Sequence, residues 1–299
     1  MSTADIAAAF IKQLTAEEWQ TLRGLERCEL GESTTSAEAI AKISRQPMER
    51  VAFALTELGK KRLIGTAGRN YKLYTPAVDL LALKYYADKD YAHALGKLIA
   101  KGKESDVFEV LSGKSELFAL KLFRLGRTSF RDVTRKRRSD SRQANTWLRS
   151  NYQAADREFR ALSRLASVTK DVPVAVACDR HTVLLRELPG VRLTNRPELL
   201  DVNGVLKEIF GTVRDAYQGA GMINGDLSEY NVLTDGARVW LIDWPQWVSR
   251  DHPNAEELLK RDISAITKFF ARSYGRVVNP EAVYGYVTGE RRFPAIRRG

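Results

Sequence analysis

The stretch 223–244 restricts the fold of this chain more than any other part of its 299 residues. Asp226 and Asn231 stand five residues apart, and Asp243 follows the apolar run 239–242. This spacing lets one loop present Asp226 and Asn231 together, and it predicts a short β-hairpin that delivers Asp243 beside them. Carboxylate and amide oxygens are ligands that hard cations such as Mg2+ prefer. The sequence therefore predicts that three polar side chains meet at one metal-binding loop.

The same spacing indicates phosphoryl-transfer chemistry. It resembles the protein-kinase catalytic loop H-R-D-L-x-x-x-N, and Leu227 matches the Leu of that pattern. In such a loop an Asp orients the attacking hydroxyl or water, while an Asn and a second Asp hold the metal ions. We therefore interpret Asp226 as the catalytic Asp and Asn231 and Asp243 as metal ligands. A lone D-x-x-x-x-N also arises on polar surface loops, but the hairpin and the second Asp favour the catalytic interpretation.

Residues 98–122 supply a candidate nucleotide-binding half. Their pattern predicts two strands around a turn at Gly102, a second turn at Gly113 and a third strand that ends at Lys121. That end resembles the V-A-I-K strand whose Lys contacts the α- and β-phosphates. A helix at 154–165 then carries Glu158, which we predict as the ion-pair partner of Lys121. The alternatives are a solvated Lys121 and a surface Glu158 among arginines.

Taken together, these motifs resemble the RIO-type atypical protein kinases, in the branch that carries an N-terminal winged helix. The matching segments occur in the family's order and span most of the chain: 102–105 (GKES), 125–130 (LGRTSF), 157–159 (REF), 225–231 (GDLSEYN), 242–246 (IDWPQ) and 252–255 (HPNA).

The resemblance implies an ATP-binding atypical serine/threonine kinase or ATPase that uses Mg2+, with Mn2+ as a substitute. It implies that Asp243 can form a transient aspartyl phosphate. Nucleotide contacts carried over by position are Gly102, Lys103, Ser105 and Lys121 at the phosphates, Glu158 as the partner of Lys121, and the hinge Glu187 and Leu188 at adenine through backbone groups.

Three positions depart from the family pattern. Ala100 stands where the phosphate loop often has its first Gly, which makes close backbone approach to phosphate harder there. Asn224 replaces the usual His before Gly-Asp, but Asn can still hydrogen-bond, so we expect the loop geometry to survive. Pro189 lies just past the hinge and has no N–H to donate to adenine. Nucleotide affinity is the property that these departures affect.

The expected fold class is α+β: a winged helix-turn-helix followed by a compact two-lobed kinase-like domain. Three helices are predicted, one after the Thr15 capping box, one capped by Thr35 or Ser36, and one starting near Pro47. A wing at 62–74 follows. The predicted domains are the winged helix at 1–76, a linker helix within 77–94, an N-lobe at 95–188 with a basic flexible insertion at about 127–146, and a C-lobe with a basic tail at 189–299.

The sequence after Asp243 lacks an A-P-E segment, so we expect no peptide-binding activation segment. ATP hydrolysis coupled to a large partner is therefore favoured over broad peptide phosphorylation. Small-molecule kinases of the aminoglycoside or choline type share the G-D-x-x-x-x-N loop and the following I-D-W, and they remain one alternative. A non-catalytic winged-helix regulator that senses nucleotide is the other.

Charge and composition bear on partners and location. The chain carries 48 Lys and Arg against 37 Asp and Glu, a formal net charge of +11, which favours a polyanionic partner. Arginines crowd 127–142. The resemblance implies the small ribosomal subunit precursor, its rRNA and ribosome assembly proteins as partners. We expect a cytoplasmic monomer without a membrane span, with Cys28 and Cys178 as thiols and no zinc site.

Overall fold

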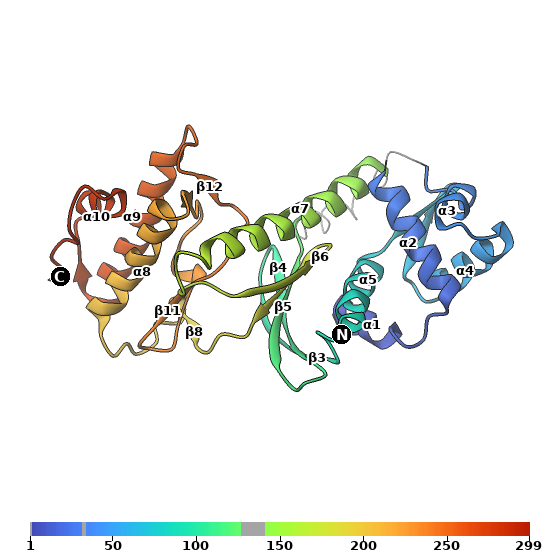
Figure 1. The fold of residues 1–299 in the computed structure, drawn as a ribbon, viewed down its shortest axis with the longest axis horizontal. Helices are drawn as coiled ribbons and strands as arrows, with labels where there is room; N and C mark the ends of the chain where they lie inside the picture. The colour runs from blue at the N-terminus through green and yellow to red at the C-terminus, as the bar shows by residue number, and fades with distance from the viewer. Residues whose placement is uncertain (1, 32–33, 127–140) are drawn as a thin grey trace. The chain divides into compact units, whose positions relative to one another are not determined.

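The computed structural model describes residues 2–31, 34–126 and 141–299, with side chains from 147 onward in the last range. The chain divides into two compact units. Unit 1 holds residues 1–155 and 178–184, and unit 2 holds residues 156–177 and 185–299. Figure 1 follows both units by colour, from the blue N-terminus to the red C-terminus. The predicted basic insertion lies mostly at 127–140, outside the described residues.

The N-terminal part of unit 1 is a winged helix-turn-helix, as the sequence predicts. Its elements are α1 (Thr3–Phe10), α2 (Ala16–Leu30), α3 (Ala37–Ser44), α4 (Met48–Lys60) and the wing strands β1 (Ile64–Ala67) and β2 (Asn70–Leu73). Thr15 and Glu18 form the expected capping box at the start of α2. Ser36, rather than Thr35, caps α3 by accepting the Ala39 N–H at 3.3 Å. Leu22, Leu25, Ile40, Val51, Leu55 and Leu58 fill the core of this part.

The helix α5 (Thr75–Asp88) follows the wing and begins two residues before the predicted start, because Pro76 fits the first turn of a helix. A buried ion pair ties α5 to the strands of unit 1. Arg124 donates two hydrogen bonds of 2.7 Å to Asp79, and His181 Nε2 lies 2.8 Å from the same carboxylate. Burial opposes ionisation, but Arg124 and His181 hold the pKa of Asp79 well below its usual range.

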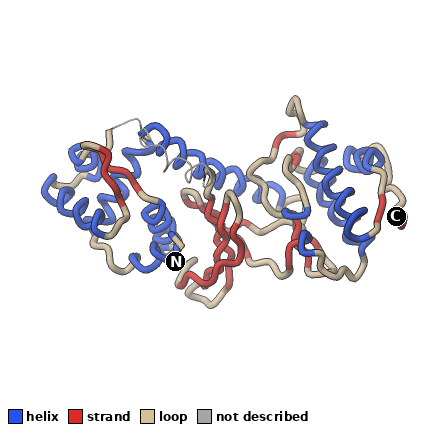
Figure 2. Tube along the Cα trace, turned by 180° about the vertical axis from the view of Figure 1, so that it is seen from behind, coloured by secondary structure: helices blue, strands red, loops and turns tan. Residues whose placement is uncertain are grey.

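A five-stranded sheet follows α5 in the order β3-β4-β5-β7-β6. Its strands, which are among the red segments of Figure 2, are β3 (Ala94–Lys101), β4 (Ser105–Leu111), β5 (Leu117–Phe123), β6 (Ala175–Asp179) and β7 (Thr182–Arg186). The sequence analysis located the first three with their turns. Burial alternates along β4, with Asp106, Phe108 and Val110 facing inward, as a sheet with one covered face requires. The register pairs Val107 with Lys121.

The helix α7 (Ser141–Leu165) corrects one expectation. The sequence analysis placed a helix at 154–165 and a flexible insertion reaching 146, whereas α7 already begins at Ser141. Residues 141–153 contain neither Gly nor Pro, so no residue in this part of the chain ends the helix. Polar and charged side chains there weakened the apolar periodicity on which the prediction relied.

Unit 2 is built on three helices, α8 (Val202–Gln218), α9 (Ala255–Tyr274) and α10 (Pro280–Thr288), which pack around Ile209, Phe210, Ile266 and Phe270. Short strands surround them: β8 (Val191–Arg192), β9 (Met222–Ile223), β10 (Val232–Thr234), β11 (Val239–Leu241), β12 (Val248–Ser249), β13 (Arg276–Val277) and β14 (Arg297–Arg298). The 3-10 turns η1 (Leu193–Asn195) and η2 (Glu229–Asn231) precede α8 and β10.

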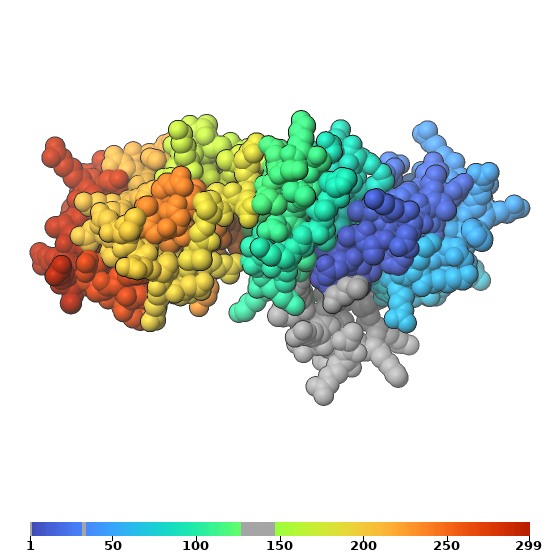
Figure 3. All heavy atoms as spheres, turned by 90° about the horizontal axis from the view of Figure 1, so that it is seen from below, coloured from blue at the N-terminus to red at the C-terminus, as the bar shows by residue number. Residues whose placement is uncertain are grey.

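The basic tail is part of the fold of unit 2. Its strand β14 pairs with β13, and the Phe293 ring lies 5.1 Å from Tyr286 and 6.3 Å from Phe210 between ring centroids. These C-terminal residues form the red end of the space-filling view (Figure 3). None of the described helices is long and apolar enough to cross a membrane. Cys28 and Cys178 are thiols rather than partners in a disulfide, as expected.

Candidate active site

The hairpin of β10 and β11 brings the predicted catalytic residues of unit 2 together. Asp226 lies in the loop after β9, Asn231 ends η2, and Asp243 comes two residues after β11. The antiparallel register pairs Val232 with Leu241. One step further, the Ile242 N–H donates to the Asn231 carbonyl at 2.9 Å. The strand pairing therefore places Asn231 beside the residue that precedes Asp243, as the sequence predicts.

Two side-chain amides connect the three segments. Asn224 donates from Nδ2 to the Asp243 carbonyl at 3.0 Å and accepts the Asp226 N–H on Oδ1 at 3.1 Å. Asn231 Nδ2 donates to the Asp226 carbonyl at 2.9 Å. The expectation that Asn224 can hydrogen-bond in place of the usual His is confirmed. The Asn231 bond uses only its Nδ2, so the chemistry of the amide lets its Oδ1 serve as a ligand oxygen.

Two residues of helix α9 that the sequence analysis missed hold the loop that contains Asp226. Asp262 accepts the N–H groups of Gly225 at 2.8 Å and Leu227 at 3.1 Å, on either side of Asp226. Arg261 donates to the Gly225 carbonyl. Burial raises the pKa of Asp262 to about 6, although the two hydrogen bonds act in the opposite direction. The sequence could have indicated Asp262, because an acidic residue within the apolar face of a helix needs a buried hydrogen-bond partner.

Gly225 is required at its place in this loop. Its φ is +77°, in the left-handed region, and a Cβ there would come within 3.2 Å of the Gln246 carbonyl oxygen. The segment after Asp243 therefore packs directly against the backbone next to Asp226.

The two carboxylates of the site influence each other. Partial burial of the Asp226 carboxyl and the negative charge of Asp243 raise the pKa of Asp226, while Arg261 lowers it. A cation would relieve the repulsion between these acids, and two carboxylates with one amide oxygen suit Mg2+. The described residues contain no cluster of three or more His, Cys, Asp or Glu side chains arranged for a metal. Mg2+ held with substrate phosphates fits such a sparse set.

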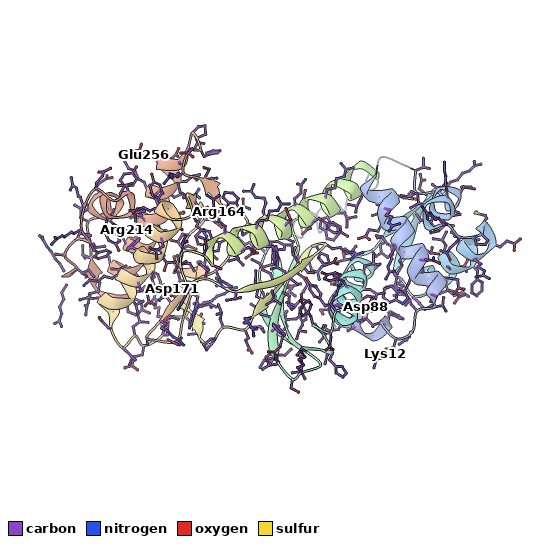
Figure 4. All side chains as sticks on the ribbon, in the orientation of Figure 1. Lys12, Asp88, Arg164, Asp171, Arg214 and Glu256 are labelled. Atoms are coloured by element: carbon purple, nitrogen blue, oxygen red, sulfur yellow. The ribbon has the colours of Figure 1, made fainter. Side chains whose placement is uncertain are left out.

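Asp243 adopts an unusual backbone conformation, with a φ of +69°. A non-glycine residue in the left-handed region costs conformational energy and persists only where its surroundings fix it. The buried Trp244 supplies part of this restraint, because its indole N–H donates to the Leu241 carbonyl at 2.9 Å. Asp171, labelled in Figure 4, accepts the Leu241 N–H on its carbonyl at 2.8 Å and so fixes the end of β11.

Glu158 contributes to the same restraint. It is 1% exposed, and its Oε1 lies 3.5 Å from the Trp244 N–H that donates to it. This burial excludes the alternative of a surface Glu. Lys121 belongs to unit 1, so the predicted Lys121–Glu158 pair joins residues of different units and stays a prediction.

Unit 1 carries the other predicted nucleotide residues. The Gly102 N–H donates to the Ser105 carbonyl at 2.7 Å and closes the tight turn between β3 and β4, with Lys103 exposed at its tip. Lys121 is only 5% exposed, which excludes a solvated strand lysine. Its ammonium lies 4.9 Å from the centre of the Phe123 ring.

The predicted hinge, Glu187 and Leu188, lies in the loop after β7 and belongs to unit 2. Gly190 fixes the path of this loop, because its φ is +115° and a Cβ would lie 2.4 Å from the Thr234 carbonyl oxygen. Pro189 stands between the hinge and Gly190, as the sequence shows.

Residues 106–283 match the RIO domain family over more than half of the chain. The chain therefore belongs to the RIO family, and the sequence-based identification is confirmed. This membership argues against the aminoglycoside and choline kinases as an alternative.

The similar proteins within that family include several Rio2 serine/threonine-protein kinases. The Caenorhabditis elegans protein is 34% identical over 75% of this chain, and the Dictyostelium discoideum protein is 29% identical over 88%. The chain spans 43% and 51% of those two proteins. The Methanocaldococcus jannaschii Rio2 is 29% identical over 84% of this chain, which spans 96% of it.

A solved structure of Rio2 kinase from Chaetomium thermophilum superposes with a TM-score of 0.82 at 29% identity, covering 95% of this chain and 88% of the other. That crystal is described as an ADP/Mg2+-phosphoaspartate complex. The match confirms the expected α+β fold, a winged helix followed by a kinase-like domain.

Proposed function

We propose that this chain is an ATP-dependent phosphotransferase of the RIO type, acting as an atypical serine/threonine kinase or an ATPase. The observation that carries the proposal is the hydrogen-bonded set of Asp226, Asn231 and Asp243, joined through Asn224. Such a set supplies an acceptor for a proton and ligands for metal ions, which are the two needs of phosphoryl transfer.

Each residue of the site has a role in this proposal. Asp226 accepts the proton of the attacking hydroxyl or water, and its raised pKa makes it a better base. Bound Mg2+ or Mn2+, held by Asn231 and Asp243, would supply charge that neutralises the phosphate oxygens. The remaining roles are those that the family resemblance implies: Gly102, Lys103, Ser105 and Lys121 contact phosphates, Glu158 orients Lys121, and the backbone of Glu187 and Leu188 meets adenine.

Asp243 is the proposed first acceptor of the phosphoryl group. An Asp243 carboxylate oxygen attacks the γ-phosphorus, the bond to the β-phosphate oxygen breaks, and ADP leaves with that oxygen. Water then hydrolyses the acyl phosphate while Asp226 takes the proton, which returns the Asp243 carboxylate and releases phosphate. The phosphoaspartate described for the Chaetomium thermophilum relative supports this route.

ATP turnover by variants tests the proposal. Asp226→Ala and Asp243→Ala are each expected to lower the turnover rate by roughly a hundred- to a thousand-fold, because each removes a principal charge contact at the reacting phosphate. Asp251→Ala is the matched control, since Asp251 is exposed after β12 and accepts no bond from the catalytic loop. Turnover at the parent rate by either site variant contradicts the assignment.

The chemistry of the label separates the two kinds of acceptor. With radiolabelled ATP we expect label on Asp243 that hydroxylamine removes and alkali hydrolyses quickly. Label that survives hydroxylamine and maps to Ser129, Ser139 or Ser141 would replace the aspartyl phosphate by a protein-kinase mechanism. The structures of Ser129 and Ser139 lie outside the described residues.

The proposed partners are the small ribosomal subunit precursor, its rRNA and assembly proteins, met by a monomer in the cytoplasm. The family resemblance and the net charge of +11 support this proposal. ATP turnover would then be linked to release from the subunit and final maturation of its RNA.

A further inference from the structure

The four residues after Asp243 form a loop between two fixed points. On one side Asp243 is tied to Asn224, and on the other β12 pairs with β9 through Val248 and Ile223. Residues 244–247 belong to no strand. Their backbone must therefore be held by other groups if Asp243 is to keep its left-handed conformation.

Arg157 on α7 holds this loop through two nitrogens of its guanidinium group. Its Nε donates to the Pro245 carbonyl at 3.0 Å, and its Nη2 donates to the Trp247 carbonyl at 2.6 Å. The guanidinium carbon also lies 5.4 Å from the centre of the Trp247 ring. The planar guanidinium presents its donors in a rigid fork, which fixes two carbonyls relative to each other better than the rotatable donors of an ammonium.

Glu158, the next residue of α7, also binds this loop. Glu158 accepts the Trp244 N–H, so consecutive residues of α7 engage an N–H and two carbonyl groups of one short loop. Pro245 has no N–H to offer, so only its carbonyl can anchor the backbone at that position.

The 244–247 loop also packs against the loop that contains Asp226. Arg157 holds the carbonyls on either side of Gln246, and the Gln246 carbonyl packs against Gly225, the residue before Asp226. A shift of this loop would therefore displace both Asp243, two residues upstream of Pro245, and Asp226.

We propose that Arg157 is a positioning residue for phosphoryl transfer, which holds Asp243 and Asp226 in place through the 244–247 loop. This inference rests on the proposed function of the same site. Arg157 itself touches no reacting group in the proposed mechanism, so its effect should appear in metal use and turnover rather than in nucleotide affinity.

The test compares Arg157→Ala, Arg157→Lys and the control Arg160→Ala. Arg160 lies about one turn further along α7, is exposed, and pairs with Asp156 on the same helix. Arg157→Ala should lower kcat by roughly ten- to a hundred-fold, as a small misplacement of reacting groups does. The Mg2+ concentration for half-maximal turnover should rise about ten-fold, while KM for ATP at saturating Mg2+ changes less than about three-fold.

Arg157→Lys should recover part of both effects, because an ammonium keeps the charge and N–H donors but not the rigid fork geometry. Hydrogen exchange gives a readout that needs no turnover: the amides of 243–249 and 224–227 should exchange faster in Arg157→Ala than in Arg160→Ala. Equal exchange and equal Mg2+ dependence in those two variants would overturn the inference. If the parent protein turns over no ATP, the proposed function fails, and the exchange rates still decide whether Arg157 holds the loop.

Discussion

Two charges of opposite sign, Asp243 and Arg261, act on the proposed base Asp226, and their balance affects the pH at which its carboxyl ionises. Asp243 and partial burial raise its pKa, whereas Arg261 lowers it. Only the ionised carboxylate can accept a proton, so turnover should rise with pH as Asp226 loses its own proton. The acid side of the pH–rate profile therefore reports on the neighbours of Asp226.

Replacing Arg261 by Gln should move the acid side of this profile to higher pH. The variant loses the positive charge that lowers the pKa of Asp226, so a higher pH is needed to ionise the carboxyl. Arg261→Lys keeps the charge and should keep the profile near that of the parent. The measurement is kcat/KM between about pH 4 and pH 8; a shift to lower pH in Arg261→Gln would contradict the assignment of Asp226 as the base.

The sequence predicted which residues of this site lie together when they are close in sequence. It did not predict contacts between residues that are distant in sequence and meet only in the folded chain. Asp226, Asn231 and Asp243 lie on one loop and hairpin, so their spacing was enough to group them. Asp262 is 35 to 37 residues from the amides that it accepts, and no local pattern connects it to them. Only the packing of α9 against the loop shows that Asp262 accepts these two amides.

At the scale of elements, one buried acid joins α2 to the wing. Glu29 on α2 accepts the Leu73 N–H of β2 at 2.6 Å. Burial raises the pKa of Glu29 to about 7, with a smaller contribution from Glu26, although the Leu73 bond lowers it. The folded state therefore binds this proton more tightly than the unfolded chain, and stability falls as pH rises from about 4.5 to about 7.

Glu29→Gln should remove this dependence. The amide oxygen can still accept the Leu73 N–H but carries no charge, so at pH 8 the variant should be more stable by about 2 kcal/mol, with little difference near pH 4. Denaturant unfolding of the full chain at several pH values measures the change. Glu49→Gln, on the exposed face of α4, is the control. A Glu29→Gln curve parallel to that of the parent would contradict the prediction.

Elements with local signals were located well from sequence. The capping box at Thr15 and the wing at 62–74 are local patterns, and both appear where expected. The predicted start of the helix at 154 was wrong, because polar side chains at 141–153 weaken the apolar periodicity there. A helix can continue through such a stretch when no Gly or Pro interrupts it.

At the scale of the whole molecule, the proposed contact with rRNA should depend on the excess of 11 positive charges. Replacing Arg135, Lys136, Arg137 and Arg138 by Ala should flatten the slope of log affinity for small subunits against log salt by up to a few units. These residues lie outside the described ranges, so the expectation rests on sequence alone.

The control variant also loses four positive charges, but from side chains that form ion pairs with carboxylates. Replacing Arg50, Lys60, Arg160 and Lys260 by Ala does so, because Glu17, Glu57, Asp156 and Glu256 pair with them. An unchanged slope in the first variant, or an equal change in both, would contradict a specific RNA contact by 135–138.

Asn224 has a consequence for the range of conditions in which the catalytic loop keeps its shape. The more usual His would gain a proton between about pH 5 and pH 8 and would then lose its capacity to accept a hydrogen bond. The amide of Asn224 does not titrate, so it can accept from the Asp226 N–H and donate to the Asp243 carbonyl across that whole interval. The two hydrogen bonds through which Asn224 links Asp226 and Asp243 therefore do not depend on pH in this interval, although the two carboxylates themselves titrate.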